Sequence, residues 1–270
     1  MGERGPALHE AAAKGFSRAA DSYEAGRPSY PAEALARIAA LVDAPRGPAV
    51  IELGAGTGKF TRWLAASGAS VLAVEPVAAF REKLAAVSVE HPSVRVVDGT
   101  AEAIPAPDGS ADAVIAAQAF HWFRGAEALA EIHRVLRPGG ALLLLWNTKD
   151  ESVDWIARLD ELMEPFRGDA PDQSKGAWKS AFASSPLGPL HHETFRLMQT
   201  GDMQTVRDRV ASVSFVSALP EAERIALLER VERLVATHPT TAGRRTIEIP
   251  YRTDLYWCTK RKAPAAASEP

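Results

Sequence analysis

The sequence predicts an α/β fold built around a mainly parallel sheet. Between residues 49 and 146, five short apolar runs of strand length alternate with stretches that carry apolar residues at helical spacing. Strands that alternate with helices favour a parallel sheet, because each helix carries the chain back to the start of the next strand. The first apolar run ends abruptly in a glycine-rich turn, which places a candidate ligand site beside the sheet.

The first predicted strand, residues 49–53, and the turn after it form the central motif of the chain. Glu52 is the acidic residue of this apolar run, and Gly54, Gly56 and Gly58 follow it at alternate positions. Glycine suits a turn that takes positive φ or lets a ligand lie against the main chain. The motif therefore predicts either a ligand-binding turn or a tight strand-to-helix turn that binds nothing.

Two known glycine patterns do not fit this turn. Counted from Gly54, the dinucleotide pattern G-x-G-x-x-G requires a glycine where the chain has Lys59. The phosphate-loop pattern also fails, because the required Lys-Ser or Lys-Thr pair is absent. The spacing is instead E-x-G-x-G-x-G.

The second predicted strand, residues 71–74, ends at Glu75, about 20 residues beyond the turn. A carboxylate at this strand end can accept hydrogen bonds from both hydroxyls of a ribose. We therefore expect Glu75 to anchor a nucleoside, the alternative being an ordinary strand-ending acid.

The same periodicity predicts the other elements. Helices are expected at residues 32–42, from residue 60 onward, and at 77–87, 126–136, 153–166, 203–212 and 221–234. Further strands are expected at residues 94–97, 111–117, 141–146, 193–198 and 246–259. Pro250 places the centre of the last strand at a bulge or an edge. Residues 168–189 are rich in Gly, Pro and Ser with little periodicity, which is typical of a specificity loop.

Two more polar segments follow predicted strands, at the edge where open α/β sheets bind ligands. They are residues 98–102, after the third strand, and residues 118–123, after the fourth. His121 is the histidine placed there, and it could orient or deprotonate a nucleophile. An equally good interpretation is a helix-start histidine that packs or hydrogen-bonds locally.

In order, these motifs resemble the class I S-adenosylmethionine-dependent methyltransferases, and within them the small-molecule group called type 11. The resemblance runs from about Phe16 to Lys260 and rests on the turn at 52–58, Glu75, residues 98–105, 118–122 and 135–140. It implies a Rossmann-like, seven-stranded, mostly parallel sheet with helices on both faces and a helical cap. It also implies S-adenosyl-L-methionine as the cofactor. The R-P-x-Y-P segment and the His-Trp pair are similar to those of trans-aconitate methyltransferases.

The resemblance assigns residues to the cofactor. It implies that the backbone of Thr100, Ala101 and Glu102 contacts the adenine, that Gln118 lies near the methionine amine, and that His121 lies beside the methyl group. The segment carrying Tyr23, Arg27 and Tyr30 resembles a lid over the methionine end, the alternative being a linker anchored by Tyr30. The cofactor-binding set implied is Glu52, Gly54, Gly56, Gly58, Glu75, Thr100, Ala101, Glu102, Gln118, Tyr23 and Arg27.

The expected organisation is a tail and lid over residues 1–31 and one methyltransferase domain over 32–262. Cap elements are expected at about 151–189 and 200–236, and a disordered tail at 263–270. The implied reaction moves a methyl group to a small carboxylate, phenol or amine. Two alternatives stay open, namely an NAD-binding oxidoreductase and a non-catalytic cofactor-binding protein of the same fold.

Composition limits the partners. A net charge of −3 and a pI near 6.2 disfavour a nucleic-acid substrate. The single cysteine, Cys258, the polar N-terminus and the absence of a long apolar run indicate a cytoplasmic protein without a membrane anchor. The expected assembly is a monomer or a homodimer. No metal is expected, because the adjacent His191 and His192 would face opposite sides of a strand.

Overall fold

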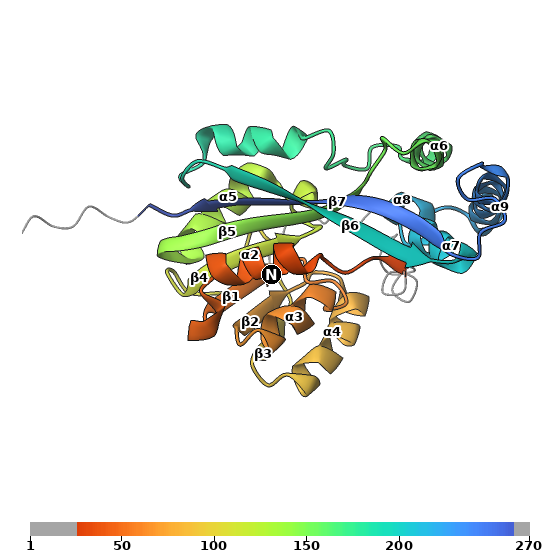
Figure 1. Ribbon diagram of the computed structural model, residues 1–270. Coiled ribbons are helices and arrows are strands. Elements are labelled where there is room, and N and C mark those ends of the chain that lie inside the picture. Colours follow the sequence, from red (N-terminus) through yellow and green to blue (C-terminus); the bar gives the residue numbers. More distant parts are fainter. Residues whose placement is uncertain (1–25, 262–270) are drawn as a thin grey trace, which may run out of the picture.

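The computed structural model describes residues 26–261, which form a single mixed sheet surrounded by helices (Figure 1). The strands are β1 (Ala49–Leu53), β2 (Ser70–Val74), β3 (Val94–Val97), β4 (Ala111–Ala117), β5 (Leu136–Lys149), β6 (His191–Gly201) and β7 (Ile247–Thr259). The α-helices are α2 (Ala32–Leu41), α3 (Lys59–Ala66), α4 (Ala78–Glu90), α5 (Gly125–Val135), α6 (Asp154–Met163), α7 (Met203–Ala211), α8 (Ser214–Ser217) and α9 (Glu221–Thr237). Short 3-10 turns include η2 (Phe120–Trp122) and η4 (Ala177–Ser184).

The strand order is β3-β2-β1-β4-β5-β7-β6, which confirms the predicted seven-stranded, mostly parallel sheet. The pairs β1–β2, β2–β3, β1–β4 and β4–β5 are parallel, whereas β7 is antiparallel to both β5 and β6. The chain therefore moves outward from β1 on one side and returns to build from β4 on the other. Such a reversal opens a crevice at the carboxyl ends of β1 and β4, where ligands bind in sheets of this kind.

Helices cover both faces of the sheet (Figure 1). One face carries α2, α3 and α4, whose apolar side chains Ile38, Phe60, Leu64, Leu84 and Val87 pack on alternate strand residues such as Val50, Ile115 and Leu143. The opposite face carries α5, η2 and η4, whose Phe120, Leu129, Ile132 and Trp178 pack on Ile51, Val114, Leu142 and Trp146. Each central strand is thus buried on both faces, which accounts for the nearly continuous apolar runs in the sequence.

A third core lies at one end of the long strands β6 and β7, where α6, α7, α8 and α9 gather (Figure 1). Trp155, Ile156, Val210, Val216 and Val231 pack there against the first part of β7. These helices come from the two segments predicted as cap elements. None of the helices within residues 26–261 is long and apolar enough to cross a bilayer.

β6 is longer than the predicted 193–198, because it pairs with β7 along its whole length from His191 to Gly201. Pro250 lies within β7 but beyond the last residue pair with β5, Lys149 and Tyr251. On that side β7 has no strand neighbour at Pro250, so the missing N–H breaks no ladder. The prediction of a bulge or an edge strand was wrong, because β7 lies between β5 and β6 and Pro250 pairs with Met198 in an unbroken register. The Pro250 carbonyl instead accepts a hydrogen bond from the Asp150 N–H over 3.0 Å.

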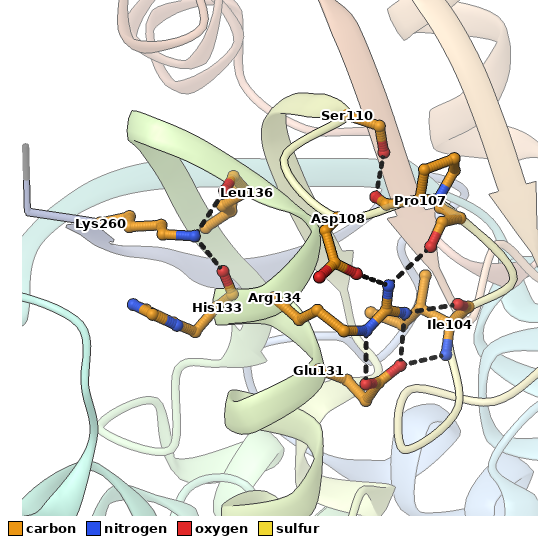
Figure 2. Close-up of polar contacts among 10 residues, drawn as sticks. Ile104, Pro107, Asp108, Ser110, Glu131, His133, Arg134, Leu136 and Lys260 are labelled. Atoms are coloured by element: carbon orange, nitrogen blue, oxygen red, sulfur yellow. Dashed lines mark hydrogen bonds and ion pairs between the residues drawn. The ribbon is translucent and has the colours of Figure 1, made fainter.

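The loop before β4 is fastened to α5 by one arginine (Figure 2). The Arg134 guanidinium donates to the Ile104 and Ala106 carbonyls, to Asp108 and to Glu131, over 2.7–2.9 Å. Glu131 in turn accepts the Ile104 N–H over 2.9 Å. At the end of α5, Lys260 donates to the His133 and Leu136 carbonyls, the position where a cation stabilises a helix. These contacts fix the loop that follows residues 98–102.

Candidate functional site

The glycine turn after β1 is shaped by close packing. Gly54 has φ of 68°, and a Cβ there would lie 2.8 Å from the Ala119 Cβ. Gly58 has φ of 89°, and a Cβ there would lie 2.7 Å from side-chain atoms of Leu84 and Val87 on α4. The turn therefore requires glycine at both positions, for its backbone conformation and for the approach of neighbouring segments.

Glu75 ties the end of β2 to this turn. Its Oε2 accepts the Gly56 N–H over 2.8 Å and its Oε1 accepts the Val77 N–H over 2.9 Å. The side chain is buried, and this burial raises the pKa of Glu75 above its ordinary value. Each carboxylate oxygen can accept more than one hydrogen bond, so acceptor capacity remains for a ligand.

Glu52 is the second buried carboxylate of the site. It points from β1 toward α3, where the Thr61 hydroxyl donates to its Oε2 over 2.6 Å. Removal from water raises the pKa of Glu52 to about 8. The side chain is therefore a neutral acid at pH 7.

A first cavity lies beside the glycine turn at the carboxyl ends of β1 and β4. Gly54, Thr57, Gln118 and Glu52 line it, together with Arg27, Tyr30, Lys59, Asn147 and Arg209. The Thr57 hydroxyl is buried and has no hydrogen-bond partner among the described residues. Gln118 has φ of 59°, and its N–H donates to the Leu145 carbonyl over 2.7 Å, which turns the chain sharply after β4. The cavity thus combines a crowded glycine backbone with an unused buried hydroxyl.

The strap, residues 26–31, crosses this cavity. Gly26 packs against α7 so tightly that a Cβ would lie 2.5 Å from the Asp208 backbone. Polar contacts fasten the strap at several points: Gln199 donates to the Gly26 carbonyl, Arg27 to the Ser212 carbonyl, Lys59 to the Arg27 carbonyl and Asn147 to the Ser29 carbonyl. The Tyr30 ring meets Phe60 edge-on at 5.4 Å between centroids. Tyr23 lies outside the described residues, so its predicted role stays a prediction.

A second cavity adjoins the first and faces the cap. Arg27, Gln118, Asn147 and Arg209 line both cavities, and the second adds charged side chains from β5, α6 and the loop after it. These charged residues are Lys149, Glu151, Asp160, Arg167 and Asp172. Lys149 contacts Asp160, and Arg167 lies 3.4 Å from Asp172. Burial, followed by the nearby Arg209 charge, lowers the pKa of Lys149 well below its usual value.

His121 lies at the wall of the second cavity, on η2. Its Nδ1 accepts a hydrogen bond from the Trp146 indole N–H over 3.2 Å. An indole nitrogen only donates, so Nδ1 carries no proton and the neutral ring is protonated at Nε2. Burial, reinforced by the Arg27 charge, lowers the pKa of His121 to about 3. The side chain is thus a neutral hydrogen-bond donor at physiological pH.

The structure does not bring every predicted residue to the cavities. Thr100 forms an isolated bridge with Ala103, Ala101 is buried in the core, and Glu102 accepts the Arg124 N–H over 2.8 Å. None of these three residues lines the two cavities described above. Three other predicted residues belong to the turn but do not line either cavity, namely Gly56, Gly58 and Glu75. The predicted residues that line at least one cavity are Glu52, Gly54, Arg27, Gln118 and His121. The adenine contacts of Thr100, Ala101 and Glu102 stay predictions.

Several lining residues were not predicted from the sequence. Asn147 follows the apolar run of β5 at the same sheet edge as Gln118, so the rule that identified Gln118 would also have found it. Thr57 lies within the glycine motif, where the adjacent glycines are the stronger sequence signal. Arg209 belongs to α7, where Arg207 and Asp208 beside it give the pattern of an ordinary solvated helix. Only the tertiary fold places Arg209 in the site.

The adjacent histidines of β6 face opposite sides, as predicted. His192 stacks on Tyr256 at 4.1 Å and bonds to Asp254 over 2.8 Å, whereas His191 stacks on Trp257 at 5.3 Å. Tyr256 and Trp257 belong to the cores on the two faces of the sheet. In the described part of the chain, no group of three or more His, Cys, Asp and Glu side chains is arranged to hold a metal ion.

Comparison with known proteins supplies independent findings. Residues 51–144 match the family model described as "Methyltransferase domain". The chain is 39% identical over 238 residues to an uncharacterized methyltransferase of Mycobacterium tuberculosis (strain ATCC 25618 / H37Rv), covering 88% of this chain and 92% of that protein. It is 34% identical over 253 residues to an uncharacterized methyltransferase-like protein of Schizosaccharomyces pombe, covering 93% and 97%.

Two further comparisons concern a named activity and a solved structure. A malonyl-[acyl-carrier protein] O-methyltransferase of Pectobacterium atrosepticum is 33% identical over 138 residues, which is 49% of this chain and 51% of that enzyme. The structure of a putative type II methyltransferase from Anaeromyxobacter dehalogenans superposes with a TM-score of 0.64 at 22% identity, covering 88% of this chain and 99% of that one. The latter likeness supports the fold.

Proposed function

This chain belongs to the class I S-adenosylmethionine-dependent methyltransferases, and we propose that it moves the cofactor's methyl group to a small-molecule acceptor. The observation that carries this proposal is the pair of adjoining cavities at the carboxyl ends of the parallel strands. The cavity beside the glycine turn suits the cofactor, and the charged cavity under the cap suits the acceptor. Four residues that line both, Arg27, Gln118, Asn147 and Arg209, mark where the two molecules would meet.

The residues of the first cavity fit S-adenosylmethionine. The cofactor presents a ribose diol, an adenine and a zwitterionic methionine. Glu75 does not line the cavity itself, but it retains acceptor capacity that we propose for the diol. The partnerless Thr57 hydroxyl, which does line the cavity, offers a buried hydrogen-bonding group. Gly54 lines this cavity with its main chain, because it has no side chain. Gln118 and Arg27 are proposed to hold the methionine end, as the family resemblance implies.

The protein's own contribution to methyl transfer is alignment and exclusion of water. When bound, the cofactor supplies a methyl group on a sulfonium, which an acceptor's electron pair takes as the carbon–sulfur bond breaks and its electrons stay on sulfur. Such chemistry needs no covalent enzyme intermediate, so holding the acceptor in line is the main requirement. We propose that the strap, together with the residues before it, acts as the lid. The cap helices would close the acceptor cavity.

We propose that His121 positions the acceptor and does not deprotonate it. Its Nδ1 is occupied by Trp146, and its remaining nitrogen already carries the proton. A general base is required only when the nucleophile begins protonated, as a phenol does at neutral pH. A carboxylate or neutral amine can attack directly. His121 then serves as a neutral donor at the wall of the acceptor cavity.

The acceptor class rests on the cavity and not on named relatives. The malonyl-[acyl-carrier protein] enzyme matches only about half of this chain, so its substrate is not carried over. Carboxylates, phenols and amines are therefore the acceptors to screen, with a monomer or homodimer as the proposed assembly. Membership of the methyltransferase family does not favour the oxidoreductase alternative.

Calorimetric titration tests this function. Purified protein is titrated with S-adenosylmethionine, S-adenosylhomocysteine and NAD, and then incubated with the first of these and candidate acceptors while release of S-adenosylhomocysteine is followed. We expect micromolar binding of the first two ligands, no binding of NAD, and turnover on at least one acceptor. Tight cofactor binding without turnover on any acceptor would indicate a non-catalytic protein. Binding of NAD alone would refute the proposal.

A further inference from the structure

The cap places an arginine without an acidic partner beside the acceptor cavity. Arg209, on α7, donates from Nε to the Tyr251 hydroxyl over 3.1 Å and lies 3.5 Å from the Ser212 hydroxyl. No carboxylate within the described residues forms an ion pair with Arg209. Most other cations of this cavity are compensated, since Lys149 contacts Asp160 and Arg167 contacts both Glu164 and Asp172.

The surroundings hold Arg209 in one position. Tyr251 accepts from Arg209 and donates its own proton to Gln199 over 3.1 Å, so the phenol is committed on both sides. Gln199 in turn donates to the Gly26 carbonyl of the strap. The guanidinium is therefore oriented by Nε on Tyr251 and by Nη1 on the Ser212 hydroxyl, and Arg209 lines the cavity. A fixed planar fork of donors is the group that best matches a carboxylate.

The charge of the cavity selects among anions. Counted by formal charge, its lining contains the cations Arg27, Lys149, Arg167 and Arg209 and the acids Glu151, Asp160 and Asp172, which leaves one formal positive charge in excess. The Arg209 charge also acts within the cavity, because it helps to lower the pKa of Lys149. A ligand with one negative charge would neutralise the site. A phosphate dianion would meet three acidic side chains without enough cations to offset them.

From these contacts we infer that Arg209 binds a carboxylate of the methyl acceptor. The inference rests on the proposed function and specifies the substrate class as a small carboxylic acid. The neutral His121 Nε2–H lies on the wall of the same cavity and is available as a second donor. The acid would approach from the cap side, with its reacting atom toward the residues shared by both cavities.

Calorimetry on protein saturated with S-adenosylhomocysteine tests this assignment. The probes are the monoanions benzoate and phenylacetate, each paired with its primary amide, and phenyl phosphate. We expect at least one acid to bind and its amide to bind at least about 10-fold more weakly, the loss typical of a charge-assisted hydrogen bond. Arg209→Gln should weaken acid binding by a similar factor. Arg209→Lys should recover only part of it, because lysine lacks the planar fork.

A matched control separates this result from general effects. Arg230→Gln removes the same charge from the exposed surface of α9 and should leave acid binding unchanged. Because Arg209 lines both cavities, the fold of Arg209→Gln is checked by its cooperative urea unfolding, which should match that of the wild type. The inference fails if no acid binds the loaded protein, if Arg209→Gln binds acids as the wild type does, or if phenyl phosphate binds better than the acids. These failures leave the proposed function intact, whereas absence of S-adenosylhomocysteine binding by the wild type would refute both.

Discussion

The Trp146 indole N–H donates to Nδ1 of His121 over 3.2 Å, and this single contact fixes the state of the histidine. Both residues belong to the sheet edge that carries the site, since Trp146 lies in β5 and His121 in η2. Because the indole can only donate, the imidazole presents Nε2–H to its other neighbours. Burial keeps the ring neutral by lowering its pKa to about 3.

Two substitutions distinguish the roles of the two ring nitrogens of His121. In His121→Asn, the amide oxygen can replace Nδ1 as the acceptor for Trp146, and the Nε2–H is lost. We expect the KM for the acceptor to rise about 10-fold, with little change in affinity for S-adenosylmethionine. His121→Gln places an amide near Nε2 and should recover part of the loss. Steady-state kinetics on the acceptor found by screening measure both.

The pH dependence of kcat/KM distinguishes a positioning role of His121 from a role as general base. With its pKa lowered to about 3, a positioning histidine contributes no change in kcat/KM between about pH 6 and pH 8. A limb with an apparent pKa near the ordinary histidine value, absent in His121→Asn, would instead identify His121 as a general base.

Two glycines with similar backbone conformations allow the crowding of the turn to be measured. Gly54 and Gly109 have φ of 68° and 58°. Of these two positions, only at Gly54 would an added Cβ lie within 3 Å of a neighbouring atom. We expect Gly109→Ala to lower the free energy of unfolding by about 1 kcal/mol, the cost of left-handed backbone. Gly54→Ala should cost about 1–3 kcal/mol more, because the Ala119 Cβ is in the way. Urea unfolding measures both, and equal losses would contradict the crowding.

Cofactor binding should follow the same order. Gly109 is outside both cavities, so Gly109→Ala is expected to leave the affinity for S-adenosylmethionine unchanged. Gly54 lines the cofactor cavity, and displacement of its backbone should weaken binding.

The sequence predicted the sheet well because burial of both faces leaves a clear record in the chain. The apolar runs of β1, β4 and β5 and the helical spacing between them depend on local pattern, which a single sequence displays. The turn glycines, Glu52 and Glu75 were also identified, because strand ends and glycine turns are local signals. Arg209 was missed, since its position depends on α7 meeting the strap far earlier in the chain. That contact is seen in the packing of Gly26 on the Asp208 backbone and in the Arg27 to Ser212 hydrogen bond, which spans 185 residues.

The Glu75 carboxylate both supports the glycine turn and is proposed to bind the cofactor's ribose. Glu75→Gln tests the proposed ribose contact. The amide keeps one acceptor oxygen but presents an NH₂ group to either the Gly56 or the Val77 N–H. We expect the affinity for S-adenosylmethionine to fall by about 1–3 kcal/mol in calorimetry. Glu229→Gln is the control, because it makes the same change on an exposed side chain of α9 outside both cavities. Unchanged affinity in Glu75→Gln would place the ribose elsewhere.

The buried acid Glu52 should make stability depend on pH in a predictable direction. Its ordinary pKa is 4.5, and burial raises it to about 8 in the folded chain. Between these values the folded state holds a proton that the unfolded state has released, so the free energy of unfolding falls as pH rises through this window. Above about pH 8 both states are ionised and the contribution is constant.

Glu52→Gln removes this proton exchange while its amide oxygen can still accept the hydrogen bond from Thr61. The variant should therefore gain stability relative to the wild type as pH rises from about 4.5 to about 8, as measured by urea unfolding across that range. Taking the difference between variant and wild type cancels the opposite trend from His121, whose lowered pKa reduces stability as pH falls below its ordinary value of 6.5. Glu229→Gln, which alters an exposed side chain on α9, should show a difference that does not vary with pH. If the Glu52→Gln difference were equally constant, Glu52 would be ionised in the folded protein, and an anionic carboxylate would face the cofactor cavity throughout this range.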